Sequence, residues 1–303
     1  MAIKTVTKNK LSFVNNRLRP VGYDFPTGGL PPRLEGFEFG PGFTTASGGT
    51  ESTSGNIKTS TFTGAGSWIV SAISETPLFE YLIVGGGGAG GAGSPWGGGG
   101  GGGGIRYGFS PSTVGTNSIT VGTGQPNQTG QGVNGGNSSI GPLVATGGGG
   151  GGYAAAGNNG GSGGGGGSDS PTYAGGLNTS HPLTGPTAPV IGFSGGAGRP
   201  SYAGGGGGAG SAGGTYVSGP LAGAGGTGFP STISGSPVIY SAGGGGGPNG
   251  IGGNAPLGGG PGNSQVGSNS NPTSYGSGSA GGGGGGFGGI STAGIVIIRW
   301  KYQ

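Results

Sequence analysis

Uninterrupted runs of glycine constrain the fold of this chain more than any other feature. Glycine supplies 94 of 303 residues, and the longest runs are Gly85–Gly88, Gly97–Gly104, Gly147–Gly152, Gly163–Gly167, Gly204–Gly208, Gly243–Gly247 and Gly281–Gly286. Ordering a glycine costs about 0.5–1 kcal/mol more than ordering an alanine, because glycine loses more backbone freedom. An ordered fold therefore requires a repeating arrangement in which these glycine backbones satisfy one another's hydrogen bonds.

A bundle of polyglycine-II helices meets that requirement. This extended threefold helix rises about 3.1 Å per residue without internal hydrogen bonds, so its N–H and C=O groups point outward to neighbours. Because glycine has no Cβ, the backbones can approach closely and add weak Cα–H···O contacts. The runs lack a strict Gly-X-Y repeat, which distinguishes them from collagen. We predict polyglycine helices over 85–104 and 147–289, with variable loops at the ends of the bundle.

Strand-forming residues cluster on both sides of the glycine region. β-branched and aromatic residues dominate Phe79–Val84 and Gly294–Tyr302, which is typical of β-strands. No helical period is visible, so we predict an all-β fold plus the polyglycine bundle, without α-helix. The expected strands lie within 57–84, 105–146 and 294–302. They would form a small β layer that brackets the bundle, with the last strand paired to the early ones.

The charge distribution divides the chain into two parts. The net charge is +4, and the first acidic residue follows a basic start that contains Lys4, Lys8, Lys10, Arg17 and Arg19. Between Gly85 and Ile298 only Arg106, Asp169 and Arg199 are charged, so nucleic acid is not an expected partner. We predict an N-terminal docking arm over 1–55 and a glycine-rich domain over 56–303.

Composition also limits the cellular setting. The chain has no cysteine, so disulfides and cysteine-bound metals are excluded. No apolar run approaches the roughly 18 residues of a membrane span, and membrane insertion is not expected. No apolar segment follows the first lysines, so the sequence predicts synthesis in a cytoplasm rather than secretion.

The sequence offers no catalytic, cofactor-binding or metal-binding site. G-x-G-x-x-G matches are frequent only because glycine is frequent, and none is followed by a helical pattern and a suitably placed acid. His181 is the single histidine, and six of the seven acids precede the glycine region. A lone histidine without nearby carboxylates favours neither acid–base catalysis nor metal binding. We therefore predict that the protein is not an enzyme.

Two long polar loops interrupt the glycine region and carry aromatic residues. They are Ser168–Phe193 and Thr215–Tyr240, and their candidate contact residues are Tyr173, His181, Phe193, Tyr216, Phe229 and Tyr240. Aromatics among Ser, Gly and Asn are typical of recognition loops, where they supply rigid amphipathic contacts. The same side chains could instead cover the bundle ends against water. Both roles remain open for different loops.

Several motifs, in a fixed order, resemble those of a known family. FTGAGSWIVSAISETPLFEYLIV runs into GGGGAGG, and SITVGTGQ, SSIGPLVATGGGGGG and a final glycine run into GIVIIRWKY follow. This series resembles the glycine-rich domain of phage tail fibres and related virion appendages, and it covers about residues 57–303. Some tail-tip adhesins that look similar display variable receptor-binding loops on a sandwich of polyglycine-II helices. Residues 1–55 have no counterpart in the resemblance.

The resemblance implies a non-catalytic structural protein of the virion, either a tail fibre or a fibre-tip adhesin. Residues 1–55 would dock to other virion proteins, the chain would form a homo-oligomer, and the loops would contact a host surface glycan or outer-membrane protein. One alternative is a capsid decoration or fibre-shaft protein without receptor binding. Another is a non-viral extracellular ice-binding or matrix protein, for which a secretory signal and a flat Thr or Ala face would be expected.

Overall fold

The structure is a computed structural model that describes residues 42–94, 96–169, 172–179, 191–216, 221–248, 251–260, 271–284 and 286–303. The chain divides between Glu38 and Phe39, and all described residues belong to the second unit, Phe39–Gln303. These residues contain β-strands and no helix, and every pair of neighbouring strands is antiparallel. The fold is therefore all-β, as the sequence predicted.

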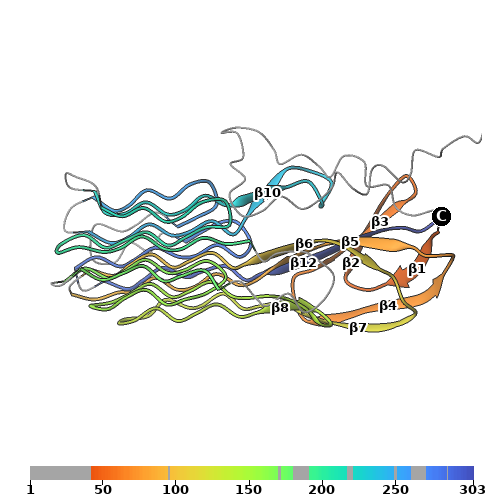
Figure 1. Cartoon of the computed structure of the whole chain (residues 1–303), viewed down its shortest axis with the longest axis horizontal. Helices are drawn as coiled ribbons and strands as arrows, with labels where there is room; N and C mark the ends of the chain where they lie inside the picture. Colours follow the sequence, from red (N-terminus) through yellow and green to blue (C-terminus); the bar gives the residue numbers. More distant parts are fainter. Residues whose placement is uncertain are drawn as a thin grey trace, which may run out of the picture. The chain divides into compact units, whose positions relative to one another are not determined.

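Two five-stranded sheets contain most of the strands (Figure 1). The first sheet has the order β1 (Thr44–Ser47), β4 (Gly66–Ile73), β7 (Gly115–Thr120), β8 (Ser138–Ile140) and β9 (Leu143–Ala145). The second sheet has the order β2 (Thr50–Ser54), β3 (Ile57–Phe62), β12 (Ile295–Lys301), β5 (Leu78–Val84) and β6 (Ile105–Pro111). A separate hairpin joins β10 (Phe229–Ser231) to β11 (Val238–Tyr240).

The two sheets share one apolar core. Alternate residues along the strands point toward the facing sheet, as the period of two requires. The first sheet contributes Ala46, Trp68, Val70, Ile119, Ile140, Leu143 and Ala145; the second contributes Phe62, Phe79, Tyr81, Ile83, Val296, Ile298 and Trp300. The ring of Trp68 lies 4.8 Å from that of Phe79 and 5.6 Å from that of Trp300. The strands thus form a β-sandwich rather than the single small layer predicted.

Strand β12 occupies the centre of the second sheet. It pairs with β3 on one side and with β5 on the other, where Ile297 lies opposite Leu82. Arg299 also forms an ion pair with Glu80 across this pairing, at 3.2 Å. The predicted pairing of the C-terminal strand with the early strands is therefore confirmed.

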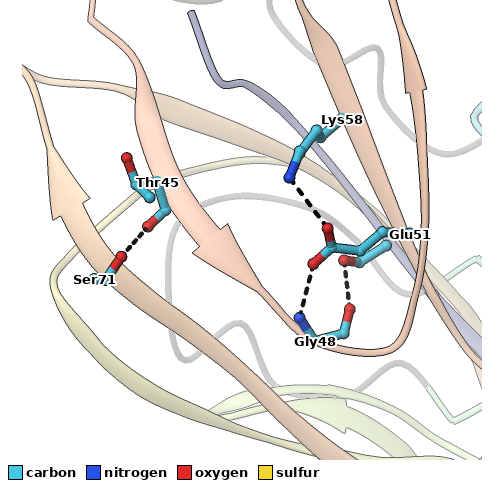
Figure 2. Close-up of polar contacts among 6 residues, drawn as sticks. Thr45, Gly48, Glu51, Lys58 and Ser71 are labelled. Atoms are coloured by element: carbon cyan, nitrogen blue, oxygen red, sulfur yellow. Dashed lines mark hydrogen bonds and ion pairs between the residues drawn. The ribbon is translucent and has the colours of Figure 1, made fainter.

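Strands β1 and β2 correct the expected boundary at residue 55. β1 pairs with β4 and β2 pairs with β3, so residues 44–54 belong to the sandwich and not to a separate arm. Figure 2 shows how the turn between them is held: Glu51 accepts a hydrogen bond from the Gly48 N–H and pairs with Lys58 at 3.2 Å. Hydroxyl-rich stretches such as TTAS and TESTS give a weak strand signal alone, and pairing with stronger neighbours stabilises them.

Two further corrections concern strands inside 105–289. The end of the region 105–146, where strands were expected without a turn being placed, forms the hairpin of β8 and β9, in which Gly141 adopts a positive φ of 51° in a tight turn. The β10–β11 hairpin lies within the region expected to contain only glycine helices and loops. Its Phe229 ring packs 5.2 Å from the ring of Tyr107 on β6.

Glycine segments continue directly from the ends of the sandwich strands. Segment 85–104 connects the end of β5 to the start of β6. The Gly85 N–H bonds to the Gly104 carbonyl, immediately beyond the last residue pair of these two strands. Segments also connect β7 to β8, follow β9 and lead into β12. Figure 1 shows these segments running side by side on one side of the sheets. We call this hydrogen-bonded array the glycine bundle.

Hydrogen bonding in the glycine bundle repeats every three residues. Along 97–104, successive N–H groups bond in turn to segments 276–282, 146–152 and 204–207, with N···O distances of 2.7–3.1 Å. The carbonyls of the same segment accept from 85–91, 162–165 and 244–247. The segment therefore has six hydrogen-bonded neighbours, whereas a β-strand has two neighbours in one plane.

A second segment is surrounded in the same way. Residues 203–209 donate to 241–247, 163–166 and 211–214, and they accept from 99–102, 193–196 and 223–226. Both 97–104 and 203–209 are completely buried. The core of the bundle is thus backbone, and a Cβ added at Gly206 would overlap the carbonyl oxygen of Gly100.

Side chains on the flank of the bundle recur at the same interval of three. Two neighbouring segments expose every third residue: Leu221, Ala224 and Thr227 on one, and Ile251, Asn254 and Leu257 on the other. The period explains where this region accepts residues other than glycine. One position in three on an outer segment faces away from all neighbours.

On another flank of the bundle, amide side chains accept the hydrogen bonds that a neighbouring backbone segment would otherwise accept. Gln131, Asn134 and Asn137 are also three residues apart, and their side-chain oxygens accept from the N–H groups of Tyr153, Gly150 and Gly147 at 2.9–3.0 Å. Buried N–H groups require such partners because leaving one unpaired costs about 1–3 kcal/mol.

Candidate recognition surface

The glycine bundle has two ends that differ in their surroundings. At the strand end, Gly85 and Gly104 directly adjoin β5 and β6. Farther along the same two glycine segments, the Gly91 N–H bonds to the Gly98 carbonyl, and this bond lies toward the opposite end of the bundle. Loops that connect segments at this second end define the far-end surface. Its described aromatic and cationic residues are Trp96, Tyr153, Tyr173, Arg199, Tyr202, Tyr216 and Phe287.

Several of these side chains are held by specific contacts. The Tyr153 hydroxyl donates to the Ser94 carbonyl at 2.7 Å, and the Ser168 hydroxyl oxygen accepts from the Trp96 N–H at 2.9 Å. The rings of Tyr202 and Tyr216 stack with centroids 4.4 Å apart and 10° between their planes. The Tyr pair is partly exposed, so the far-end surface presents an ordered aromatic platform.

The backbone fixes the loop that carries this stack. Arg199 and Tyr202 exchange two backbone hydrogen bonds of 2.7 and 3.0 Å, closing a tight turn in which Ser201 has a positive φ of 72°. A non-glycine residue with positive φ is uncommon and requires support from its surroundings. Tyr202 is thereby placed immediately before the buried segment 203–209.

The structure separates the candidate contact residues predicted from the sequence. Tyr173 and Tyr216 lie on the far-end surface, whereas Phe193 lies near the strands, where its N–H bonds to the Gly208 carbonyl. Phe229 and Tyr240 belong to the β10–β11 hairpin and are 3% and 1% exposed. Their rings are packed inside the protein, so we remove both from the candidate contacts.

Other predicted positions lie outside the described residues. These are His181 and the docking candidates Lys4, Lys8, Lys10, Arg17 and Arg19. Sequence reasoning also omitted Trp96, Tyr153, Arg199 and Tyr202 from its candidate contacts. The sequence could have indicated the three aromatic residues, because each lies next to a glycine run or one residue away from it, where a segment of the bundle ends.

The chemistry of the far-end surface is polar, aromatic and nearly uncharged. Its described charged residues are Arg199 and Asp169, both exposed. At the strand end of the bundle, burial raises the pKa of Tyr107 and of Tyr240. Within the described ranges, no group of three or more acidic or histidine side chains could hold a metal ion. The same ranges contain no helix able to cross a membrane.

The family model described as a glycine-rich domain matches residues 59–301. The chain belongs to the glycine-rich domain family. A comparison with curated proteins gives no match. The matched glycine-rich domain starts within β3 and ends on the last residue of β12, so it includes the bundle and the sandwich strands from β3 onward but not β1 and β2.

Proposed function

We propose that the glycine segments of this glycine-rich domain are polyglycine-II helices. The support is the three-residue repeat of hydrogen-bond direction along 97–104 and the six neighbours of 97–104 and 203–209. A helix with three residues per turn directs its N–H groups to three sides, and its carbonyls reach three more neighbours. Some neighbouring segments run antiparallel to 97–104 and others run parallel to it. From Gly97 to Gly104, the residue numbers of the bonded partners decrease within 276–282 and increase within 204–207.

We propose that the protein is a non-catalytic virion appendage of a phage, a tail fibre or fibre-tip adhesin, whose far-end surface contacts the host. The observation that carries this proposal is the position of the stacked Tyr202–Tyr216 pair on loops at the end of the bundle away from the strands. A core made of backbone places few demands on its loops, so the loops can vary while the fold persists. A host glycan or an exposed loop of an outer-membrane protein fits the aromatic, weakly charged chemistry.

Replacing both stacked tyrosines tests this role. Virions carrying Tyr202→Ala and Tyr216→Ala together are expected to adsorb to host cells at least about tenfold more slowly, because aromatic anchors dominate most recognition surfaces. The matched control is Phe43→Ala on the sandwich, which removes a 43% exposed aromatic ring far from these loops in the chain. Adsorption should change little with salt, since few charges steer the encounter.

Normal adsorption by the double variant, with normal particle assembly, would contradict receptor binding through this surface. It would instead favour the alternative of a capsid decoration or fibre-shaft protein. Particle counts by electron microscopy and quantification of the chain in purified virions separate a defect in assembly from a defect in adsorption.

We propose that residues preceding β1 dock the protein to other virion proteins. The basic residues of this region are Lys4, Lys8, Lys10, Arg17 and Arg19, and the first described strand of the sandwich begins at Thr44. A chain that starts at residue 42 should fold, because it retains every described strand, but it should be missing from purified particles. Incorporation of this fragment at the copy number of the full chain would refute the assignment, and immunoblotting of purified virions measures it.

A further inference from the structure

A buried arginine lies between the two sheets of the sandwich. Arg106 is the second residue of β6 and stands directly opposite Ile83 of β5. Opposed residues of an antiparallel pair share a face, and Ile83 belongs to the core between the sheets. The side chain of Arg106 is therefore directed into this core, and the residue is 1% exposed.

The guanidinium of Arg106 is not satisfied by the described protein. Its Nε and Nη2 atoms have no hydrogen-bond partner, and neither does the hydroxyl of Tyr81. Burial raises the pKa of Tyr81, and the neighbouring positive charge of Arg106 opposes that shift. Tyr81 lies opposite Gly108, two residues from Arg106 on the same face of β6. A weak side-chain contact with Arg106 also lowers the Tyr81 pKa, but it falls outside normal hydrogen-bond geometry. A buried charge in this condition is strongly destabilising unless something compensates it.

No carboxylate of the described residues compensates this charge. The structure describes four acidic side chains, and none forms an ion pair with Arg106. Two of them pair with Lys58 and Arg299 at 3.2 Å. The other two, Glu75 and Asp169, are exposed.

The same core holds an excess of hydrogen-bond donors. The indole Nε1 atoms of Trp68 and Trp300 are also buried without a partner, and indole and guanidinium nitrogens can only donate. A water molecule would accept two of these bonds but would bring two hydrogens that need acceptors of their own. An anion beside Arg106 would accept from the guanidinium and from the Tyr81 hydroxyl and would also neutralise the charge. Trp300 lies opposite Phe79, four residues along β5 from Ile83, and is out of reach of that anion.

We infer that Arg106 and Tyr81 form an internal binding site for one small monovalent anion, with chloride as the physiological occupant. One negative charge balances one guanidinium, whereas a buried sulfate or phosphate dianion would leave a net charge in a medium of low dielectric. The Arg106 nitrogens and the Tyr81 hydroxyl would donate to the ion. Because it lies in the sandwich, this site is independent of the far-end surface and of the proposed adhesin role.

Thermal unfolding of the full chain tests the site in sodium chloride against sodium gluconate at equal ionic strength. Gluconate is too large to enter, so chloride should raise the melting temperature by about 5 °C when present at roughly 100 times its dissociation constant. Arg106→Met should abolish this difference. Arg299→Met is the control, since it removes an arginine that already has a carboxylate partner, and it should keep the difference.

Bromide provides a test on the unaltered protein, which matters if Arg106→Met fails to fold. Crystals of the full chain grown in sodium bromide should show an anomalous-difference peak between the Arg106 guanidinium and the Tyr81 hydroxyl. Equal melting temperatures in the two salts, or crystals with no bromide peak beside Arg106, would overturn the proposal.

Discussion

A valine at position 206 is expected to abolish folding of the glycine-rich domain. Gly206 is buried, its N–H donates to Gly244 and its carbonyl accepts from Gly226, both at 2.8 Å. Even a Cβ atom there would overlap the carbonyl oxygen of Gly100. Neighbouring segments contact each other backbone to backbone, so relief of the overlap requires their separation. We expect a loss of more than about 4 kcal/mol, in the range of the most damaging substitutions.

Denaturant unfolding of purified Gly206→Val, or its recovery only as insoluble protein, measures this effect. Ala224→Val is the matched control because Ala224 lies on an outer segment of the same bundle at an exposed position. It adds bulk without entering the core and should change stability by less than about 0.5 kcal/mol. A soluble Gly206→Val protein with the stability of the unaltered chain would show that the bundle does not depend on close backbone contact.

Removal of residues 295–303 should unfold both the sandwich and the glycine bundle. Strand β12 lies between β3 and β5, and it supplies Val296, Ile298 and Trp300 to the core. Loss of one buried tryptophan alone costs about 3–5 kcal/mol. Without β12 the second sheet splits into β2–β3 and β5–β6, and segments 85–104 lose the sheet from which they extend.

Limited proteolysis followed by mass spectrometry reports on each part separately. The truncated chain should be cleaved rapidly within 85–294, whereas a chain that lacks only the exposed Gln303 should resist as the full chain does. Continued protease resistance of the glycine segments after deletion of β12 would show that the bundle is stable without the sandwich.

Local composition was sufficient to predict much of the strand framework. Runs such as Phe79–Val84 and Gly294–Tyr302 are rich in β-branched and aromatic residues, and such residues favour strands in most contexts. Their positions on both sides of the glycine region also predicted that β12 pairs with the early strands. β1, β2 and the β10–β11 hairpin were missed because they are short or hydroxyl-rich, and neighbouring strands stabilise them more than their own residues do.

The sequence by itself determined that this protein is all-β and that an ordered glycine region must satisfy its hydrogen bonds between neighbouring backbones. Only the tertiary structure decided which segments are neighbours, because pure glycine runs carry no side chains that distinguish one partner from another. That arrangement places Tyr216 at the far end and buries Phe229 and Tyr240 beside the strands. It also encloses Arg106 between the sheets. These outcomes depend on contacts between residues far apart in the chain, which local sequence patterns do not specify.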